Sequence, residues 1–395
     1  MAAINEYTID KKYHDALIEW QRKNFPDIGL LEKYWDVYFP NDPAWRLTAK
    51  LSEVKADLIN QGKYQGVKKY ATAREMKGSM LYQALRIIKA QCSTELGSIQ
   101  QHMDTVNTCY TDKAKFSVLR IMAEEFRHAY QMFWVLSHDP SWSTTGSSRI
   151  AENTLDELLS MNTGSHVLDA FNIPFTDSLD NVTFACFIDR VGRFQLTMQE
   201  EFAYAPMAAS MRPMLKEEAF HLKTGWEVLK EICEMAAVGE GPWTLADIQK
   251  KINLWYPRAL EMFGSEEGGE SNLEFSFKTM SNKEAIGGYI KEIEWLLNSL
   301  NAAILQRRHP ELSKEQVRLM AKETAILRLP STRFLRFRSG EGIHESTFDV
   351  DGNRISPFEY INYLTRVLPE KLCSTEYFRS YTDRIRQALP TMTAA

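Results

Sequence analysis

Residues 118–136 read VLRIMAEEFRHAYQMFWVL, and this stretch decides the fold. Its apolar residues recur at every third or fourth position, which predicts an amphipathic helix with one buried face. Glu125 falls on that apolar stripe, and His128 joins it one turn later. Because an ionised carboxylate on a buried face is costly unless it is paired or binds a metal, the stripe predicts a ligand site. A Glu and a His three positions apart face the same way and can hold one cation.

A second stretch repeats the arrangement. Residues 211–225 read MRPMLKEEAFHLKTG and place Glu218 and His221 on one apolar face. With 52 acids in 395 residues, eight histidines should have an acid three positions upstream about once (8 × 52/395), but three of them do. The third pair, Glu341 and His344, lies among glycines outside any predicted helix, so we treat it as coincidence. A single E-x-x-H pair is weak evidence, since a surface ion pair has the same spacing.

Each of the two helical pairs has a further carboxylate upstream. Glu95 lies 30 residues before Glu125, and Asp189 lies 29 residues before Glu218. This spacing suits two antiparallel helices that carry their ligands at mid-length. One carboxylate from each of two helices and an E-x-x-H from each of two others form the ligand set of di-iron four-helix bundles. The sequence therefore predicts an all-α, ferritin-like four-helix di-iron bundle; the alternative is a set of buried polar pairs without metal.

The third carboxylate has competitors. Glu200 and Glu201 lie only 17–18 residues before Glu218, which leaves room for short half-helices, so Asp189 is preferred and Glu201 is the alternative. Gln91 lies one turn before Glu95 on the same face. We expect it to orient a ligand or substrate; a core amide with no such role is the alternative.

Two further acids lie close to the histidines in sequence. Glu124 precedes His128 by four residues, and Glu217 precedes His221 by the same interval. Each is expected to accept a hydrogen bond from the free ring N–H of that histidine and to fix its tautomer. The alternative is that both are charges on a solvent-facing helix surface.

Composition agrees with a helical, globular chain. Gly and Pro together are 33 of 395 residues, about 8% against a usual ~12%. A net charge of −5 argues against a chain whose whole surface binds nucleic acid. The five cysteines show no C-x-x-C spacing, the N-terminus has no apolar signal segment, and no run of 18 apolar residues occurs. We expect a soluble, cytoplasmic protein that binds neither nucleic acid nor membrane.

Three regions follow from the patterns along the chain. Residues 1–70 are predicted to be an N-terminal helical extension, residues 71–325 the di-iron core with additional helices, and residues 326–395 a C-terminal tail. The tail is expected to hold a basic extended segment and a small β-hairpin around an Asp-Gly turn. Helices are predicted at 14–24, 46–66, 75–106, 111–136, 149–162, 165–171, 178–203, 206–237, 283–306 and 312–325, with a kink at Pro213.

Three stretches carry a family resemblance: FAYAPMAASMRPMLKEEAFHLKTG (202–225), FIDRVGRFQL (187–196) and QCSTE (91–95). They resemble the oxygenase component of benzoyl-CoA 2,3-epoxidases, and the tail is loosely similar to that family's C-terminal region. The resemblance covers about residues 75–235 and, less closely, 326–370. The chain looks shorter than members of that family.

The resemblance implies a site and a reaction. Two irons would be held by Glu95, Glu125, His128, Asp189, Glu218 and His221, with Gln91 as a catalytic residue beside them. The reaction would be epoxidation of benzoyl-CoA to 2,3-epoxybenzoyl-CoA with O2, in aerobic aromatic degradation. Electrons from NADPH would come through a separate flavin/iron–sulfur reductase, because the sequence shows no GxGxxG motif or cysteine cluster. Another aryl-CoA, such as phenylacetyl-CoA, is the alternative substrate.

Coenzyme A is an anion, and an acidic protein must meet it with local positive charge. Arg333, Arg336 and Arg338 lie close together in the basic extended part of the tail, so we expect this segment to present them to the nucleotide. Arg212 and the pair Arg307-Arg308 are further candidates. The alternative for all of these residues is ordinary solvated surface.

Three other protein classes share parts of this pattern. An iron-storage ferritin would have the bundle but a much shorter chain without a tail. A ribonucleotide reductase radical subunit would need a tyrosine beside the irons, and Tyr130 is expected to point away from them. A non-catalytic helical interaction module would bind no iron.

Overall fold

The computed structural model describes residues 4–145, 149–335 and 347–392. Within them, fifteen α-helices account for most of the chain and a two-stranded sheet is the only sheet, which confirms the all-α class. In chain order the elements are β1 (Ile4–Tyr7), α1 (Lys11–Asn24), α2 (Ile28–Tyr38), β2 (Ala49–Ser52), the 3-10 helix η1 (Ala73–Glu75), α3 (Ser79–Thr105), η2 (Val106–Thr108), α4 (Asp112–Ser137), α5 (Ser141–Thr145), α6 (Ile150–Ser160), η3 (Asp169–Asn172), α7 (Ser178–Gln199), α8 (Ala205–Ala237), α9 (Leu245–Glu261), α10 (Glu270–Glu274), α11 (Asn282–Arg308), α12 (Lys314–Glu323), α13 (Pro357–Val367), α14 (Glu370–Cys373) and α15 (Glu376–Met392).

The chain divides into two compact units. The first comprises residues 1–173, 192–221 and 267–282, and the second comprises residues 174–191, 222–266 and 283–395. The boundaries pass through α7 and α8, so each of these helices contributes one part to each unit. The regions predicted from sequence, with limits at 70/71 and 325/326, stay predictions.

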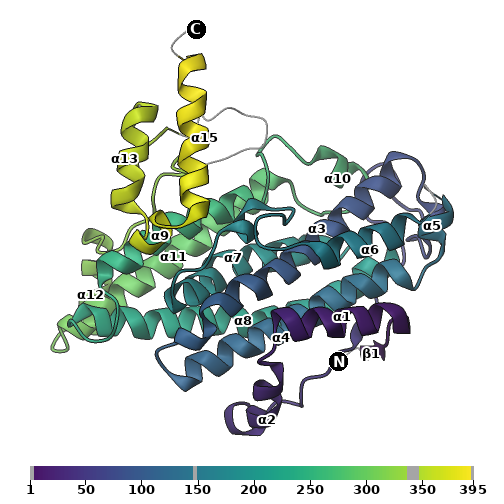
Figure 1. The fold of residues 1–395 in the computed structure, drawn as a ribbon, viewed down its shortest axis with the longest axis horizontal. Helices are drawn as coiled ribbons and strands as arrows, with labels where there is room; N and C mark the ends of the chain where they lie inside the picture. Colours follow the sequence, from purple (N-terminus) through teal and green to yellow (C-terminus); the bar gives the residue numbers. More distant parts are fainter. Residues whose placement is uncertain (1–3, 146–148, 336–346, 393–395) are drawn as a thin grey trace. The chain divides into compact units, whose positions relative to one another are not determined.

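A ferritin-like four-helix bundle lies in the first unit. It consists of α3, α4, residues 192–199 of α7 and residues 205–221 of α8. Figure 1 shows α3 and α4 running side by side, and the two helices contact each other. Between α4 and α8, Gln131 Nε2 donates to Ser210 Oγ at 2.9 Å. Within the first unit, α3, α4 and α8 carry five of the predicted ligands, whereas Asp189 lies in the part of α7 that belongs to the second unit.

The sequence explains why α4 begins and packs where it does. The Thr111 side chain accepts a hydrogen bond from the Ala114 N–H, which caps the helix at the position predicted. The predicted apolar stripe is buried, with Val118, Met122 and Met132 at most 2% exposed. Burial of that stripe against α3 stabilises both helices more than local propensity does.

The N-terminal region is only partly helical. The helix predicted at 14–24 is confirmed within α1, but the helix predicted at 46–66 is wrong. Residues 49–52 form β2, which pairs antiparallel with β1 from Ile4↔Ser52 to Tyr7↔Ala49. In addition, the Lys50 N–H donates to Gln131 Oε1 at 2.6 Å. These tertiary hydrogen bonds override the local preference of the segment.

The core helices agree closely with the predictions. The helices predicted at 75–106, 149–162, 283–306 and 312–325 correspond to α3, α6, α11 and α12. The prediction at 165–171 is wrong, because only the short η3 forms there. Helix α8 continues through Pro213. No helix within residues 4–145, 149–335 and 347–392 has both the length and the apolar character needed to cross a membrane.

The second unit holds α9, α11, α12 and the tail. Glycine is required at position 225, because a Cβ there would lie 2.6 Å from the backbone nitrogen of Cys186. On α9, Trp255 Nε1 donates to Asp180 Oδ1 at 3.0 Å, and Lys251 Nζ lies 2.7 Å from Asp180 Oδ2. These contacts hold α9 to the beginning of α7.

The tail contains more helix than predicted. The predicted hairpin is confirmed as one antiparallel bridge, Phe348↔Arg354, with Gly352 at φ +86° in the Asp-Gly turn. Beyond it, α13 and α15 occupy residues for which no helix was predicted. Helix α13 begins with a capping box of Ser356 and Glu359, a local signal that marks its start.

Candidate metal centre

Five of the predicted ligands gather inside the first unit. Glu95 comes from α3, Glu125 and His128 from α4, and Glu218 and His221 from α8. The three glutamates are 4% exposed and the two histidines are fully buried. So many ionisable groups in one interior require charge compensation, which a cation would supply.

The first histidine faces three carboxylates. His128 Nδ1 lies 3.5 Å from Glu95 Oε2, 3.7 Å from Glu125 Oε2 and 3.8 Å from Glu218 Oε1. These distances are too long for good hydrogen bonds but suit neighbouring ligands around one metal ion. Glu95, Glu125 and His128 form one group whose ligand atoms lie within 4.8 Å of one another.

The second histidine repeats this arrangement with the other oxygens of the same acids. His221 Nδ1 lies 3.6 Å from Glu125 Oε1 and 3.5 Å from Glu218 Oε2. Glu125 and Glu218 therefore each turn one oxygen to His128 and the other to His221. Two carboxylates in these positions could each hold both ions of a metal pair.

The donor set fits a pair of irons. His128 Nδ1 and Glu218 Oε2 are buried and have no hydrogen-bond partner among the described residues. Such orphaned atoms are costly in an interior unless a metal ion satisfies them. Carboxylate oxygens and imidazole nitrogens are suitable ligands for iron.

The outer nitrogens of both histidines are also occupied, but in a crossed arrangement. His128 Nε2 lies 3.1 Å from Glu217 Oε2, and His221 Nε2 lies 3.0 Å from Glu124 Oε2. Glu124 and Glu217 thus each contact the outer nitrogen of a histidine, as expected. The expected pairs, Glu124 with His128 and Glu217 with His221, are wrong. Each histidine uses the acid of the opposite helix, which links α4 and α8 twice.

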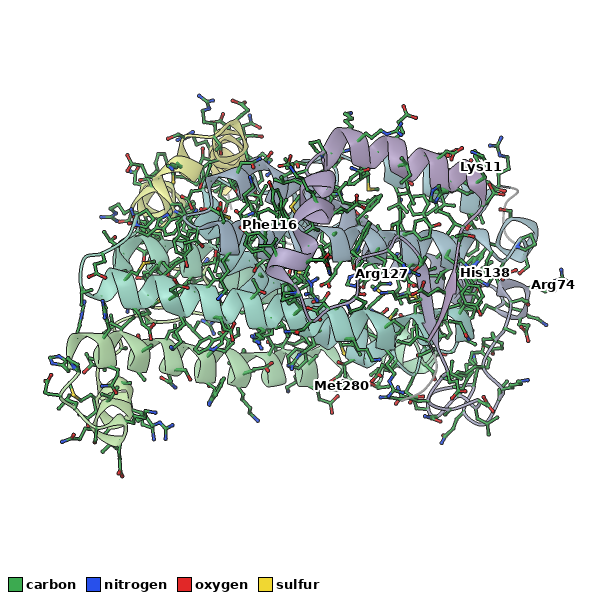
Figure 2. All side chains as sticks on the ribbon, turned by 90° about the horizontal axis from the view of Figure 1, so that it is seen from below. Lys11, Arg74, Phe116, Arg127, His138 and Met280 are labelled. Atoms are coloured by element: carbon green, nitrogen blue, oxygen red, sulfur yellow. The ribbon has the colours of Figure 1, made fainter. Side chains whose placement is uncertain are left out.

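Cations hold these two outer carboxylates. Arg127 Nε donates to Glu217 Oε2 at 2.7 Å, and Lys50 Nζ lies 3.1 Å from Glu217 Oε1. Figure 2 labels Arg127 among the side chains of the molecule. On the other side, Arg120 Nε donates to Glu124 Oε1 at 3.0 Å. The three cations were not predicted as parts of the site. A signal existed for Arg120, which precedes Glu124 by one helical turn.

The electrostatics favour charged outer groups. Burial opposes ionisation of Glu217, but Arg127, His128 and Lys50 hold its pKa well below the usual range. Burial lowers the pKa of His128, and contacts with Glu217 and Glu95 more than reverse this, so the net pKa is raised. In the neutral imidazole, the anion beside Nε2 favours the proton on that nitrogen, so the Nδ1 lone pair faces Glu95, Glu125 and Glu218.

Gln91 lies beside the centre. Its Nε2 donates a hydrogen bond to Glu95 Oε1. It is partly buried and one turn before Glu95 on α3, as expected. The amide can therefore orient Glu95; its role toward a substrate stays a prediction.

The predicted third carboxylate remains a prediction. Asp189 is a buried residue of α7, 6% exposed. Its competitor Glu201 follows the end of α7 and is used elsewhere, since Glu201 Oε2 accepts from Asn60 Nδ2 at 3.0 Å and lies 3.6 Å from Lys69 Nζ. Glu200 pairs with Lys55.

The predicted coenzyme A arginines are only partly described. Arg336 and Arg338 lie outside the described residues. Arg333 lies in a turn rather than on the extended strand that was expected, and its guanidinium lies 5.4 Å from the Phe348 ring centroid. Of the further candidates, Arg212 is exposed and Arg307 pairs with Glu240 at 3.1 Å.

Tyr130 points to the N-terminal region. Its hydroxyl accepts from the Ile9 N–H at 3.0 Å and lies 3.2 Å from His14 Nδ1. These contacts occupy the hydroxyl, in keeping with the expectation that Tyr130 is not a metal-side radical residue.

Comparisons with known proteins identify the family of the chain. The profile of the family described as phenylacetic acid catabolic protein matches residues 145–349, which is 205 of 395 residues. Benzoyl-CoA oxygenase component B of Aromatoleum evansii is 28% identical over 268 residues, with 62% of this chain and 55% of the relative covered. This chain spans about half the length of that relative. Because the profile matches more than half of the chain, the chain belongs to the phenylacetic acid catabolic protein family.

Proposed function

We propose that this chain is the oxygenase component of a di-iron monooxygenase that epoxidises the aromatic ring of an aryl-CoA thioester. Benzoyl-CoA is the first candidate, and 2,3-epoxybenzoyl-CoA the product. The observation that carries the proposal is the mirrored set in which Glu125 and Glu218 each turn one oxygen to His128 and one to His221. The name of the Aromatoleum relative supports the substrate class.

The proposed ligands have distinct roles. Glu95, His128, His221 and Asp189 would each hold one of two irons, while Glu125 and Glu218 would hold both. When bound, the iron pair supplies the activation of O2 for insertion of one oxygen atom into the ring. The other oxygen atom is reduced to water, and this reduction consumes two electrons and two protons.

The protein residues around the centre would exclude water from it and fix the orientation of its ligands. Burial of the ligand side chains keeps bulk water away from the reacting groups. Gln91 would orient Glu95, and Glu124 and Glu217 would fix the two imidazole rings. NADPH would supply the electrons through a separate flavin/iron–sulfur reductase, in keeping with the word "component" in the relative's name.

The thioester would position the ring. Binding energy from the nucleotide part of the substrate can hold a small ring at the irons, so free benzoate should react poorly. The basic tail residues Arg333, Arg336 and Arg338 are the proposed phosphate contacts. We place the protein in the cytoplasm, where coenzyme A thioesters are made.

Phenylacetyl-CoA is the second candidate substrate, because the family description names phenylacetic acid. A substrate panel separates the two: benzoyl-CoA, phenylacetyl-CoA, 2-aminobenzoyl-CoA and free benzoate, each with reductase, NADPH and labelled O2. Mass spectrometry should find the oxygen label in the 2,3-epoxybenzoyl-CoA formed from benzoyl-CoA. Label in another thioester would keep the chemistry and replace the substrate, whereas label in free benzoate alone would contradict the thioester assignment. No label in any product would favour a non-oxygenase ferritin-like protein.

A further inference from the structure

The N-terminal arm, residues 4–52, is connected to the outer side of both predicted histidine ligands, through Glu217 on the His128 side and through Arg120 and Glu124 on the His221 side. It is fixed to α4 by the hydrogen bonds from the Ile9 N–H to Tyr130 and from the Lys50 N–H to Gln131. Sequence patterns gave this arm no role at the centre. Its side chains nevertheless complete the hydrogen-bond chains that lead to the histidines.

On the His128 side, the arm contributes Lys50. Its ammonium lies 3.1 Å from Glu217 Oε1, while the other oxygen, Oε2, faces His128 Nε2 and Arg127. Lys50 and Arg127 thus take different oxygens of one carboxylate. Two cations in these positions restrict rotation of the carboxylate and keep Oε2 aimed at the imidazole.

On the His221 side, the arm contributes Asp42. Its Oδ2 accepts from Arg120 Nη1 at 2.6 Å, and Arg120 in turn donates to Glu124. The Arg120 guanidinium lies 3.8 Å from the centroid of Phe220 and 4.8 Å from that of Phe39. The order is Lys50–Glu217–His128 on one side and Asp42–Arg120–Glu124–His221 on the other, and in both chains an arginine of α4 contacts the carboxylate next to the histidine.

We propose that Lys50 is a positioning residue for the metal centre: it holds Glu217 so that His128 keeps its ring proton on Nε2 and its Nδ1 toward Glu95, Glu125 and Glu218. This inference rests on the proposed di-iron function. Partners of metal-bound histidines typically change metal affinity 10–100-fold when they are removed. The N-terminal arm is then part of the metal site although it supplies no ligand.

The test compares Lys50→Met with Lys55→Met. Both remove one positive charge, but Lys55 pairs with Glu200, which is not part of the chains described above. Iron content, the rate of iron release to a chelator, and the visible spectrum are measured on the purified full chain. Lys50→Met should release one of two irons about 10-fold faster than wild type or more. Lys55→Met should match wild type, and Lys50→Arg should restore slow release.

A double-mutant cycle with Glu217→Gln shows whether Lys50 acts through that carboxylate. Lys50→Met should add little to the release rate in the Glu217→Gln background. Equal release from wild type and Lys50→Met, full additivity in the cycle, or fast release from Lys50→Arg would each overturn the inference while leaving the iron site intact. A wild-type chain without iron would instead overturn the proposed function, and this inference with it.

Discussion

At the scale of single residues, sequence spacing located the centre but not its outer connections. The spacing predicted four residues of the centre: Glu125, His128, Glu218 and His221. A Glu and a His three positions apart on an apolar stripe are costly to bury unless they are paired or bind a metal. The partner of each outer nitrogen could not be predicted. A histidine that turns Nδ1 into the bundle carries Nε2 toward the neighbouring helix, so the acid that it meets is fixed by packing rather than by spacing.

One residue-scale prediction concerns Asp189. Asp189→Ala should remove iron from one of the two positions and abolish turnover, because no other residue is proposed as the terminal carboxylate beside His221. Glu201→Ala is the control, since Glu201 is held by Asn60 and Lys69. Elemental analysis of both variants measures the loss. If Glu201→Ala loses iron and Asp189→Ala keeps it, the ligand assignment is reversed.

A second residue-scale prediction concerns pH. Burial lowers the pKa of His166 to about 4, although a hydrogen bond with Ser93 partly opposes this. In the unfolded chain the histidine pKa is ~6.5. Between this pH and the lower pKa of the folded chain, the unfolded chain binds a proton that the folded chain does not bind. The contribution of neutral His166 to the free energy of unfolding is therefore fully present above about pH 6.5 and is lost as pH falls toward about 4.

The measurement is urea unfolding at several pH values for wild type and His166→Gln. The free energy of unfolding of the variant should depend less steeply on pH between about 4 and 6.5. The same substitution at the half-exposed His309 controls for the loss of a histidine. Parallel pH profiles for wild type and His166→Gln would refute the burial argument.

At the scale of elements, helices with strong apolar periodicity were predictable and segments shaped by tertiary contacts were not. Helices α3, α4 and α11 have long stripes and begin or end close to the predicted residues. The strand β2 was mistaken for helix because only its pairing with β1 and its hydrogen bond to Gln131 distinguish it. Helices α13 and α15 lie beyond the predicted hairpin, in a part of the tail for which no element was predicted.

The element-scale prediction compares two helical glycines. An added Cβ at Gly225 of α8 would lie 2.6 Å from the Cys186 nitrogen, whereas one at Gly287 of α11 would meet nothing within 4 Å. Gly225→Ala should therefore destabilise the protein by about 1–3 kcal/mol through overpacking. Gly287→Ala should stabilise it by about 1 kcal/mol through helix propensity. Chemical denaturation of both variants measures the difference, and equal effects would contradict the packing described for α8.

At the scale of the whole molecule, composition and periodicity predicted the all-α class and the four-helix bundle. They could not predict that α7 and α8 are shared between two compact units, because that division depends on long-range packing. The family profile covers Asp189, Glu218 and His221 but begins after Glu95, Glu125 and His128. Only the folded chain brings the α3 and α4 ligands to those of α8.

The iron content of the purified chain tests the central claim most directly. Protein expressed with an iron supply is analysed for metals, and its visible spectrum is recorded before reduction, after reduction and after exposure to O2. The two mirrored histidine positions predict about two irons per chain and a spectrum that responds to both treatments. A metal-free protein, or one that binds a single zinc, would contradict the di-iron account.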